Sequence, residues 1–197
     1  MIEGPEILLN EELHEYKVDG QVRVSVTQVL KDLGFINFDN VPADRLETAR
    51  QRGKAVHACC HFLEEGDLNW STVAPNIWPY VEAYALMKEE TGWIASQRER
   101  VLFCPLLNYA GQLDGFGSMA KLGIEEVLPD YKSGVPQRAA RYQTAGYAVA
   151  IGKHYVPRCS IHLKPTGKYK IHWYRDYDDI NDWKSIVRTF HLKHRKD

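Results

Sequence analysis

The sequence has few cysteines, no long apolar run and almost no net charge. Its four cysteines include no Cys-x-x-Cys pair, and the first ten residues lack the basic and apolar regions of a signal peptide. No window approaches the roughly 18 consecutive apolar residues that cross a bilayer. These absences favour an intracellular protein of a reducing cytoplasm and argue against a membrane role.

Length and charge limit the architecture and the way in which a partner could bind. With 197 residues, of which 44% are hydrophobic, the chain can build one ordinary domain with a proper core. The formal net charge of -1 gives no global basic field, so nucleic acid would have to bind to local patches. We expect a single domain, with an N-terminal β-hairpin and helices in residues 1–95 and a mixed sheet with flanking helices in residues 96–197.

Turn and capping signals delimit short elements in the first half of the chain. Asp19-Gly20 lies between alternating apolar residues, a pattern that favours a tight hairpin. Ser25 can cap a helix that Gly34 ends, and Gly66 ends a longer one that begins near Pro42. The expected elements are strands over residues 6–9, 13–18 and 21–24, and helices over residues 26–33, 42–65 and 75–91.

The hydrophobic period changes to two in the second half, which predicts strands. Three successive strands are expected over residues 98–104, 109–119 and 124–132, followed by a helix over residues 137–152. A last hairpin over residues 158–164 and 169–174 precedes a final helix over residues 178–194 with a basic end. The fold class that these elements indicate is mixed α/β.

Two acids and a lysine come together if the second and third central strands form a hairpin. When paired residue numbers sum to 244, Asp114 faces Asp130, and two like charges so close call for a cation between them. Asp130 and Lys132 share one face because they lie two apart on a strand. Such oxygen ligands suit Mg²⁺ or Mn²⁺. The alternative for an isolated Asp-x-Lys is a solvated surface ion pair.

Four further residues are candidates, each with an ordinary structural alternative. Gln143 and Tyr147 share a helix face and could hold a phosphate or a base, or could simply pack. His57 follows Gly53 by four residues on a helix, and a histidine there is most often satisfied or exposed. Glu99 begins the first central strand and could lean towards the acids, or could pair with a neighbouring arginine.

Taken in order, these motifs resemble the RecB-like branch of the PD-(D/E)XK nucleases. The N-terminal segment is similar to that of small phage, prophage and mitochondrial exonucleases of the same group, through His14-x-Tyr16, Gly20 and Ser25-Val-Thr-Gln28. The resemblance therefore covers most of the chain. The motifs are Gly53-x-x-x-His57, Glu99, Gly111-Gln-Leu-Asp114, Asp130-Tyr-Lys132-Ser-Gly134 and Gln143-x-x-x-Tyr147.

The resemblance implies a restriction-endonuclease-like core and assigns a role to each candidate. Asp114, Asp130 and the carbonyl of Tyr131 would bind the metal, and Lys132 would orient or deprotonate water. His57 would be an additional ligand. Gln143 and Tyr147 would support the site and contact DNA. Glu99 would either lie behind the metal ligands or bind a second metal ion.

Two departures from the family pattern stand out. Asp130 replaces a glutamate found in many members, and Pro129 removes one hydrogen bond from a supposedly central strand, which predicts a bulge or a short pairing. Relatives with an iron–sulfur cluster carry a C-terminal cysteine trio that is missing here. We expect no such cluster, and we interpret Cys59 and Cys60 as core residues.

The resulting hypothesis is a bacterial or phage-encoded, Mg²⁺- or Mn²⁺-dependent deoxyribonuclease, an exonuclease of recombination, repair or phage DNA processing. Its partners would be DNA with single-stranded ends and a recombination or replication protein. The alternatives are a catalytically silent nucleic-acid-binding or scaffold module and a site-specific endonuclease. From the positions of the positive charges, we expect the DNA to be contacted by Arg45, Arg50, Arg52, Arg138, Arg141 and the tail over residues 193–196.

Overall fold

The structure is a computed structural model that describes residues 5–10, 13 and 15–195. His14 and Lys196, which the sequence analysis named, lie outside the described residues. The chain forms two sheets and five α-helices within this range. The expected mixed α/β class is therefore confirmed.

A small antiparallel sheet opens the chain, as the sequence predicts. Its strands are β1 (Ile7–Asn10), β2 (Glu15–Val18) and β3 (Gln21–Arg23). The turn between β2 and β3 is made by Asp19 and Gly20, which both have positive φ, at 49° and 75°. A two-residue hairpin turn of type I′ requires positive φ angles at both central residues, and the Asp-Gly pair tolerates them.

Three helices follow the small sheet. Ser25 caps α1 (Val26–Asp32) in a full capping box with Gln28. Pro42 precedes α2 (Ala43–Glu65), and Gly66 ends it in the left-handed conformation, as expected. The third helix, α3, spans Trp78–Thr91 and begins three residues later than predicted, because a 3-10 turn at Trp70–Thr72 and a short loop precede it.

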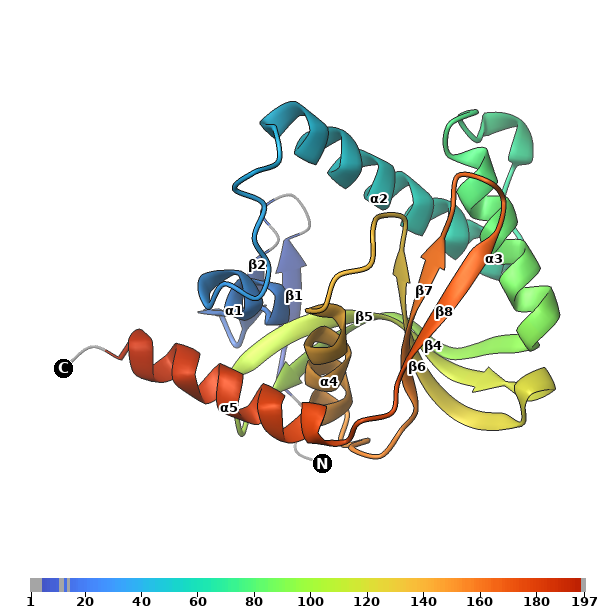
Figure 1. The fold of residues 1–197 in the computed structure, drawn as a ribbon. Helices are drawn as coiled ribbons and strands as arrows, with labels where there is room; N and C mark the ends of the chain where they lie inside the picture. Colours follow the sequence, from blue (N-terminus) through green and yellow to red (C-terminus); the bar gives the residue numbers. More distant parts are fainter. Residues whose placement is uncertain (1–4, 11–12, 14, 196–197) are drawn as a thin grey trace.

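The main sheet has five strands in the order β4-β5-β6-β7-β8 (Figure 1). Only the β6–β7 pair is parallel; the other neighbours are antiparallel, so the sheet is mixed. Helix α4 joins the two parallel strands, which need such a crossover. The strand bounds are Trp93–Cys104 for β4, Tyr109–Met119 for β5, Ile124–Lys132 for β6, Arg158–Leu163 for β7 and Tyr169–Tyr174 for β8.

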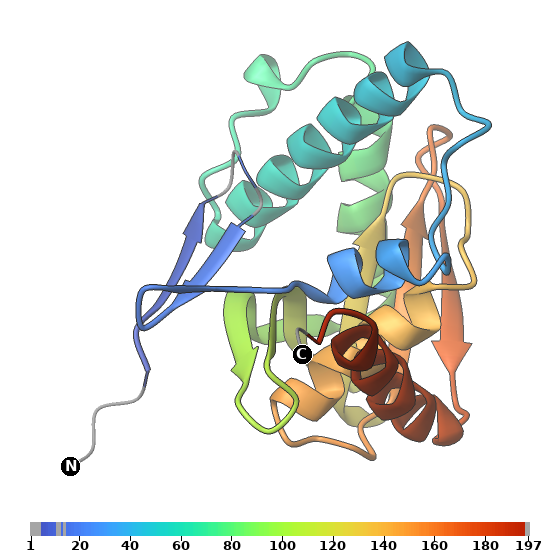
Figure 2. The same cartoon turned by 90° about the vertical axis from the view of Figure 1, so that its left-hand side faces the viewer.

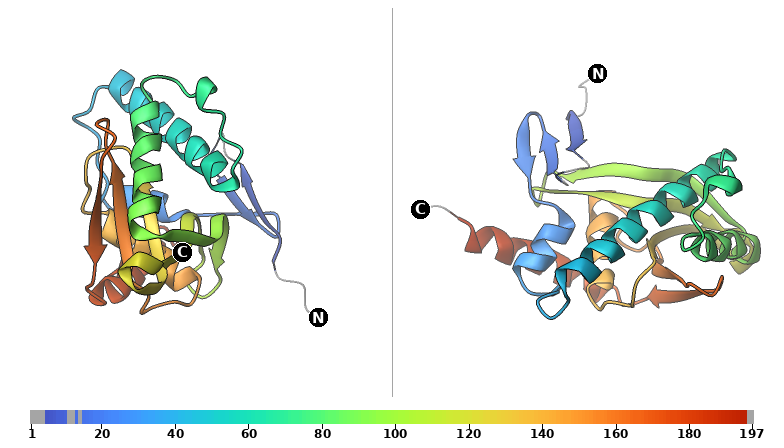
Figure 3. Two further views of the ribbon diagram at one scale, coloured as in Figure 1. Left: turned by 90° about the vertical axis from the view of Figure 1, so that its right-hand side faces the viewer. Right: turned by 90° about the horizontal axis from the view of Figure 1, so that it is seen from above.

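Helices cover both faces of this sheet (Figures 2 and 3). Helix α3 contacts β4, β7 and β8, and α2 lies beside α3. Helix α4 (Ala140–Ala150) contacts β5, β6 and β7, and packs against α1 and α5 (Asp178–Lys193). None of the helices in the described part of the chain has the length and apolar character needed to cross a membrane. The buried apolar residues accordingly form two clusters, one under each group of helices.

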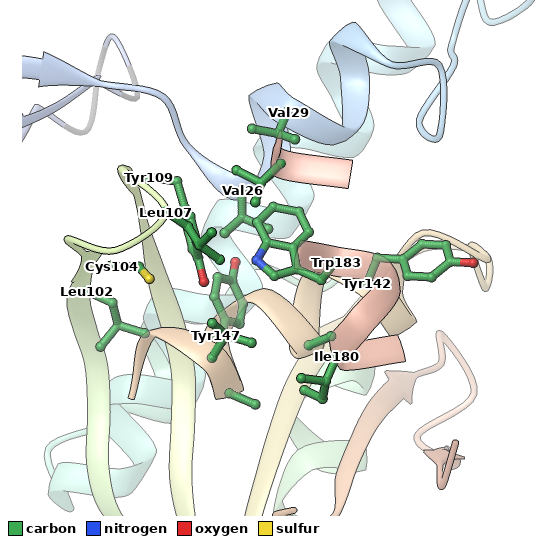
Figure 4. Packing of buried hydrophobic residues seen from close by; sticks show 14 of the residues in the cluster. Val26, Val29, Leu102, Cys104, Leu107, Tyr109, Tyr142, Tyr147, Ile180 and Trp183 are labelled. Atoms are coloured by element: carbon green, nitrogen blue, oxygen red, sulfur yellow. The ribbon is translucent and has the colours of Figure 1, made fainter. Parts of the chain in front are cut away.

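The first of these clusters includes Tyr147 of α4 and Trp183 of α5 (Figure 4). Two glycines allow these two rings to pack closely against the backbone of a neighbouring element. A Cβ atom on Gly111 of β5 would lie 2.9 Å from the ring of Tyr147, and one on Gly146 would lie 2.9 Å from the ring of Trp183. Both distances are shorter than real Cβ contacts, so a side chain at Gly111 would push α4 off the sheet, and one at Gly146 would push α4 away from α5. Gly53 differs, because a Cβ atom there would lie an ordinary 3.9 Å from the Ser133 hydroxyl oxygen.

The starts of two elements in the second half differ from the prediction. Strand β4 begins at Trp93 instead of residue 98, directly after Gly92 ends α3 with a positive φ of 66°. Helix α4 begins at Ala140 instead of residue 137, because the preceding segment forms a loop that contains Pro136. The early start of β4 matters for the site, since it places Glu99 in the middle of that strand.

Candidate metal centre

Three side chains from different elements converge near the middle of the β4–β5 pair. His57 on α2, Glu99 on β4 and Asp114 on β5 offer ligand atoms that all lie within 4.8 Å of one another. His57 Nδ1 lies 3.7 Å from Glu99 Oε1 and 3.7 Å from Asp114 Oδ1. We call these three residues the acidic cluster.

Glu99 reaches the acidic cluster through an irregular position in β4. Arg98 pairs with Gly115 and Arg100 with Leu113, so the register places Glu99 across from Asp114. Glu99 has a positive φ of 42°, which is uncommon for a residue with a side chain and is found where function maintains strain. The prediction that Glu99 begins the strand was wrong. Its carboxylate contacts His57 rather than a neighbouring arginine.

The β5–β6 hairpin carries the second irregularity. Gly117 pairs with Val127, in the expected register that sums to 244, but the next recorded pair is Met119 with Ile124 and the ladder does not extend to Asp114. Asp114 therefore does not face Asp130 as a ladder partner, and this detail of the prediction was wrong. Its Oδ2 instead accepts a hydrogen bond of 2.6 Å from the N–H of Tyr131. The short pairing expected from Pro129 is confirmed.

The carbonyl of Tyr131 orients the histidine. His57 Nε2 donates to this oxygen at 3.1 Å, which leaves Nδ1 directed at the two carboxylates. Metal-binding histidines typically donate their second N–H to a backbone carbonyl in this way. The carbonyl was expected to be a ligand itself, whereas in this geometry it is the acceptor that holds the imidazole.

Asp130 and Lys132 form a second group beside the acidic cluster. Lys132 Nζ lies 2.8 Å from Asp130 Oδ2 and donates to Gln143 Oε1 at 3.1 Å. Gln143 Nε2 in turn donates to the hydroxyl of Tyr147 at 2.9 Å. Gln143 and Tyr147, which were expected to share one helix face, thus support the lysine. Asp130 belongs to this chain of hydrogen bonds and lies outside the three-residue acidic cluster.

Burial and mutual charge shift the pKa values of Asp114, Asp130, His57 and Lys132. Burial raises the pKa of Asp114, and it raises the pKa of Asp130 to about 6, assisted by the charge of Asp114 and opposed by Lys132. Burial alone would lower the pKa of His57, but Asp114 and Glu99 outweigh it and raise that pKa to about 9. Burial likewise opposes the charge of Lys132, and Asp130 and Asp114 raise its pKa nevertheless.

The acidic cluster fits a divalent cation. An imidazole nitrogen and carboxylate oxygens are a donor set that Mn²⁺ accepts readily, with Mg²⁺ served by the oxygens. The pocket that these residues line has a volume of about 10 Å³, which is roughly the space of one water molecule or one small ion. Without a cation, two carboxylates share one imidazole, and burial penalises their charge.

The same pocket includes residues that the sequence analysis did not assign to the site. Glu64 lines it, is only 6% exposed, and is held by Lys88 at 2.8 Å and by the Tyr84 hydroxyl at 2.7 Å. Glu64 follows His57 by seven residues, a helical spacing that puts both on one face of α2 and could have revealed it. Tyr16 of β2 does not line the pocket but is buried, and burial and the charges of Asp114 and Glu99 raise its pKa.

The predicted DNA-contacting arginines differ in what holds them. Arg50 pairs with Glu47 at 2.8 Å. Arg141 binds Asp179, which also binds the buried Arg158 at 3.0 Å. We call Arg141, Arg158 and Asp179 the arginine cluster, in which the Arg141 side chain remains 27% exposed. Among the described residues no carboxylate pairs with Arg45, Arg52 or Arg138.

The cysteines lie in separate parts of the structure. Cys60 and Cys159 belong to one apolar cluster and Cys104 to the other, while Cys59 is half-buried beside the first. The interpretation of Cys60 as a core residue is confirmed. Compared with known proteins, the chain matches no family model and no curated protein.

Proposed function

We propose that the protein is a metal-dependent deoxyribonuclease that hydrolyses phosphodiester bonds. The observation that carries the proposal is the acidic cluster of His57, Glu99 and Asp114 directly beside the Asp130–Lys132 pair. The two groups are joined by Tyr131, whose N–H binds Asp114 and whose carbonyl binds His57. A cation site and a fixed ammonium group thus lie next to each other, which is the arrangement that phosphodiester hydrolysis needs.

A divalent ion bound by the acidic cluster would polarise a phosphate oxygen and lower the pKa of a nearby water molecule. The chain's own residues would do the rest. Asp114 and Glu99 hold their carboxylates towards the ligand position, and the bond from His57 to the Tyr131 carbonyl fixes the imidazole tautomer that presents Nδ1. Water then adds to phosphorus as the bond to one sugar oxygen breaks.

Lys132 acts as a cation in this scheme rather than as a base. Its raised pKa keeps the ammonium protonated at neutral pH. Bonds to Asp130 and Gln143 hold the ammonium in one place, so it can orient water and stabilise the charge that develops on the phosphate. Tyr147 fixes Gln143 from behind and itself packs against Gly111. The supporting chain is therefore rigid from the sheet to the ammonium.

The choice of DNA, and of an exonuclease with a restriction-endonuclease-like core, is supported by the ordered motifs of the sequence. The mixed sheet with helices on both faces agrees with that core at the level of architecture. A role in recombination, repair or phage DNA processing follows from the same resemblance, as does an association with a recombination or replication protein.

The direct test is cleavage of end-labelled DNA, single- and double-stranded, linear and circular, with Mn²⁺, with Mg²⁺ and with chelator. We expect degradation of linear DNA that requires a metal, with Mn²⁺ the better ion because a histidine takes part. Cleavage of circular DNA would replace the exonuclease by an endonuclease. A pure protein that leaves every substrate intact would refute the proposal and favour a silent nucleic-acid-binding module.

The chain offers a matched control for the role of the lysine. Asp182-Trp-Lys184 repeats the Asp-x-Lys spacing on helix α5, where Asp182 is exposed. We expect Lys132→Met to abolish cleavage and Lys184→Met to leave it unchanged. Equal activity in the two variants would show that Lys132 has no part in the reaction.

A further inference from the structure

A second, larger groove lies at the end of β7 and β8, next to the loop that follows Lys132. It has a volume of about 470 Å³, and residues 133–136 form one of its walls. None of its described lining residues is an aspartate or a glutamate, although the chain as a whole has a net charge of -1. The basic or ionisable residues that line it are Arg52, His162, Lys164, Lys170 and His172.

Three cations of this groove, Arg52, Lys164 and Lys170, have no acidic partner among the described residues. Among the described residues no carboxylate lies within ion-pair distance of Arg52, Lys164 or Lys170, whereas Arg50, Lys88 and Lys153 elsewhere each have an acidic partner. The Arg52 guanidinium packs over the ring of Tyr80 at 5.6 Å, and its buried Nε has no hydrogen-bond partner. A buried Nε–H group without an acceptor is a costly arrangement, and a phosphate bound to this guanidinium would offset that cost.

Hydrogen bonds hold the wall of the groove in place. His162 Nδ1 donates to the carbonyl of Gly134 at 3.2 Å, and its Nε2 lies 3.0 Å from the hydroxyl of Ser160. That hydroxyl also lies 2.8 Å from the hydroxyl of Tyr174. The loop after Lys132 is therefore attached to β7 and β8 before any ligand arrives. A preformed site of this kind loses little entropy on binding.

The register of the sheet relates the groove to the proposed catalytic lysine. Lys132 pairs with His162, and His162 pairs with Lys170, so the three residues form one row across β6, β7 and β8 on the same face. Two strand spacings amount to about 10 Å. Each strand of B-form DNA rises about 3.4 Å per nucleotide along the helix axis, so this distance corresponds to about three nucleotides of a strand in that form.

We propose that this groove binds a backbone phosphate of the DNA strand through Arg52, Lys164 and Lys170, about three nucleotides from the bond that is cut. The location of the phosphate relative to the cut rests on the proposed nuclease function. Binding of the strand by the groove does not, because it needs neither metal nor cleavage. The two proposals can therefore fail separately.

The test is binding of a fluorescent single-stranded oligonucleotide in chelator, with Lys164 and Lys170 changed to glutamine together. Both lysines are exposed, so folding is not at risk, and a thermal melt checks this. We expect binding to weaken about 10-fold, and the slope of log K against log[salt] to decrease by about 0.7, which is the contribution of one phosphate contact on a single strand. A double change of Lys31 and Lys184 to glutamine removes the same charge elsewhere and should alter neither quantity.

Two results would overturn the proposal. If the groove variant and the Lys31/Lys184 control bind alike, the groove takes no phosphate from the strand. If inorganic phosphate at the concentration of the oligonucleotide's own phosphates displaces it, the groove is a site for a small phosphate ligand instead.

A single uncharged methylphosphonate linkage, moved along a substrate cleaved by the wild-type protein, then locates the contact. We expect the largest loss of cleavage rate with the neutral linkage about three nucleotides from the cut. A loss confined to the cut linkage would refute the assigned position. If no substrate is cleaved under any condition while the salt slope still differs between the groove variant and the control, the nuclease proposal fails and the binding site remains.

Discussion

The acidic cluster and the arginine cluster are two groups of poorly exposed charges with opposite balance. In the arginine cluster, two guanidinium groups bind one carboxylate, that of Asp179, which is fully buried. In the acidic cluster, two carboxylates share one imidazole, and among the described residues neither Glu99 nor Asp114 pairs with a lysine or an arginine. Asp176 also binds Arg141 at 3.1 Å, so the charges around the arginine cluster balance within the chain, whereas the acidic cluster has surplus negative charge.

This difference separates a structural role from a binding role. A buried carboxylate with two guanidinium partners stabilises the fold only as long as all three are present, because removing one leaves an unpaired charge. Neighbouring carboxylates without a cation between them repel each other and lower the stability of the folded state, and a bound ion removes this repulsion. Substitutions in the two clusters should therefore have opposite consequences, and the following predictions are ordered by the size of the expected effect.

The largest expected effect is on catalysis. Asp114→Asn removes a charged ligand without changing the side-chain size, and we expect cleavage to fall by about a thousandfold. Asp179→Asn should keep the rate within a few-fold at a temperature where it is folded. Initial rates on labelled linear DNA measure both. A loss of activity in Asp179→Asn equal to that in Asp114→Asn would remove the functional distinction between the clusters.

Stability should respond in the opposite order. Asp179→Asn leaves the buried guanidinium of Arg158 without its counter-charge, and we expect the free energy of unfolding to fall by about 3–5 kcal/mol. Asp114→Asn relieves repulsion in the metal-free protein and should leave stability unchanged or higher. Urea denaturation in chelator gives both values. Strong destabilisation by Asp114→Asn would mean that the acid is a structural element.

Added Mn²⁺ should act on one cluster alone. Binding to the folded state stabilises it by about 2.7 kcal/mol at 100 times the dissociation constant, so the melting temperature of the wild type should rise. Asp114→Asn should abolish this rise, Glu99→Gln should reduce it, and Asp179→Asn should retain it from a lower starting point. A rise of equal size in wild type and Asp114→Asn would locate the ion elsewhere.

A smaller effect is expected from pH in the metal-free protein. The pKa of Asp130 is raised to about 6, above the value of about 3.9 in the unfolded chain, so the folded state takes up a proton first as the pH falls. The contribution of Asp130 to stability should therefore increase by about 1 kcal/mol between pH 7 and pH 5. The difference between wild type and Asp130→Asn in denaturant titrations isolates it. A difference that is independent of pH would contradict the shift.

Regular patterns in the sequence sufficed to predict most of the fold. Strands β5, β6 and β8 have the expected bounds because turns and a period of two mark them on both sides. The start of β4 was missed because Gly92 ends α3 and the strand begins at the next residue, with no loop between them. Local signals identify an element well only where something separates it from its neighbour.

The residues of the acidic cluster could be named from the sequence, but which of them face each other could not. The motifs name His57, Glu99 and Asp114, yet which acid faces Asp114 depends on the positive φ at Glu99 and on the short β5–β6 ladder. Neither follows from counting residues across a hairpin. The pairing of Arg141 with Asp179 was equally hidden, because the two residues are far apart in the sequence and meet only when α5 packs on α4.

The peptide groups on either side of Tyr131 have one more consequence. The N–H of this residue binds Asp114 and its carbonyl binds His57, so both contacts belong to the main chain. Exchanging the side chain cannot delete either bond, and a mutational scan would record only the loss of packing around the phenol. Replacing the amide of residue 131 by an ester through chemical synthesis would remove the N–H alone. That single-atom exchange would reveal a contribution to the centre that genetics cannot detect.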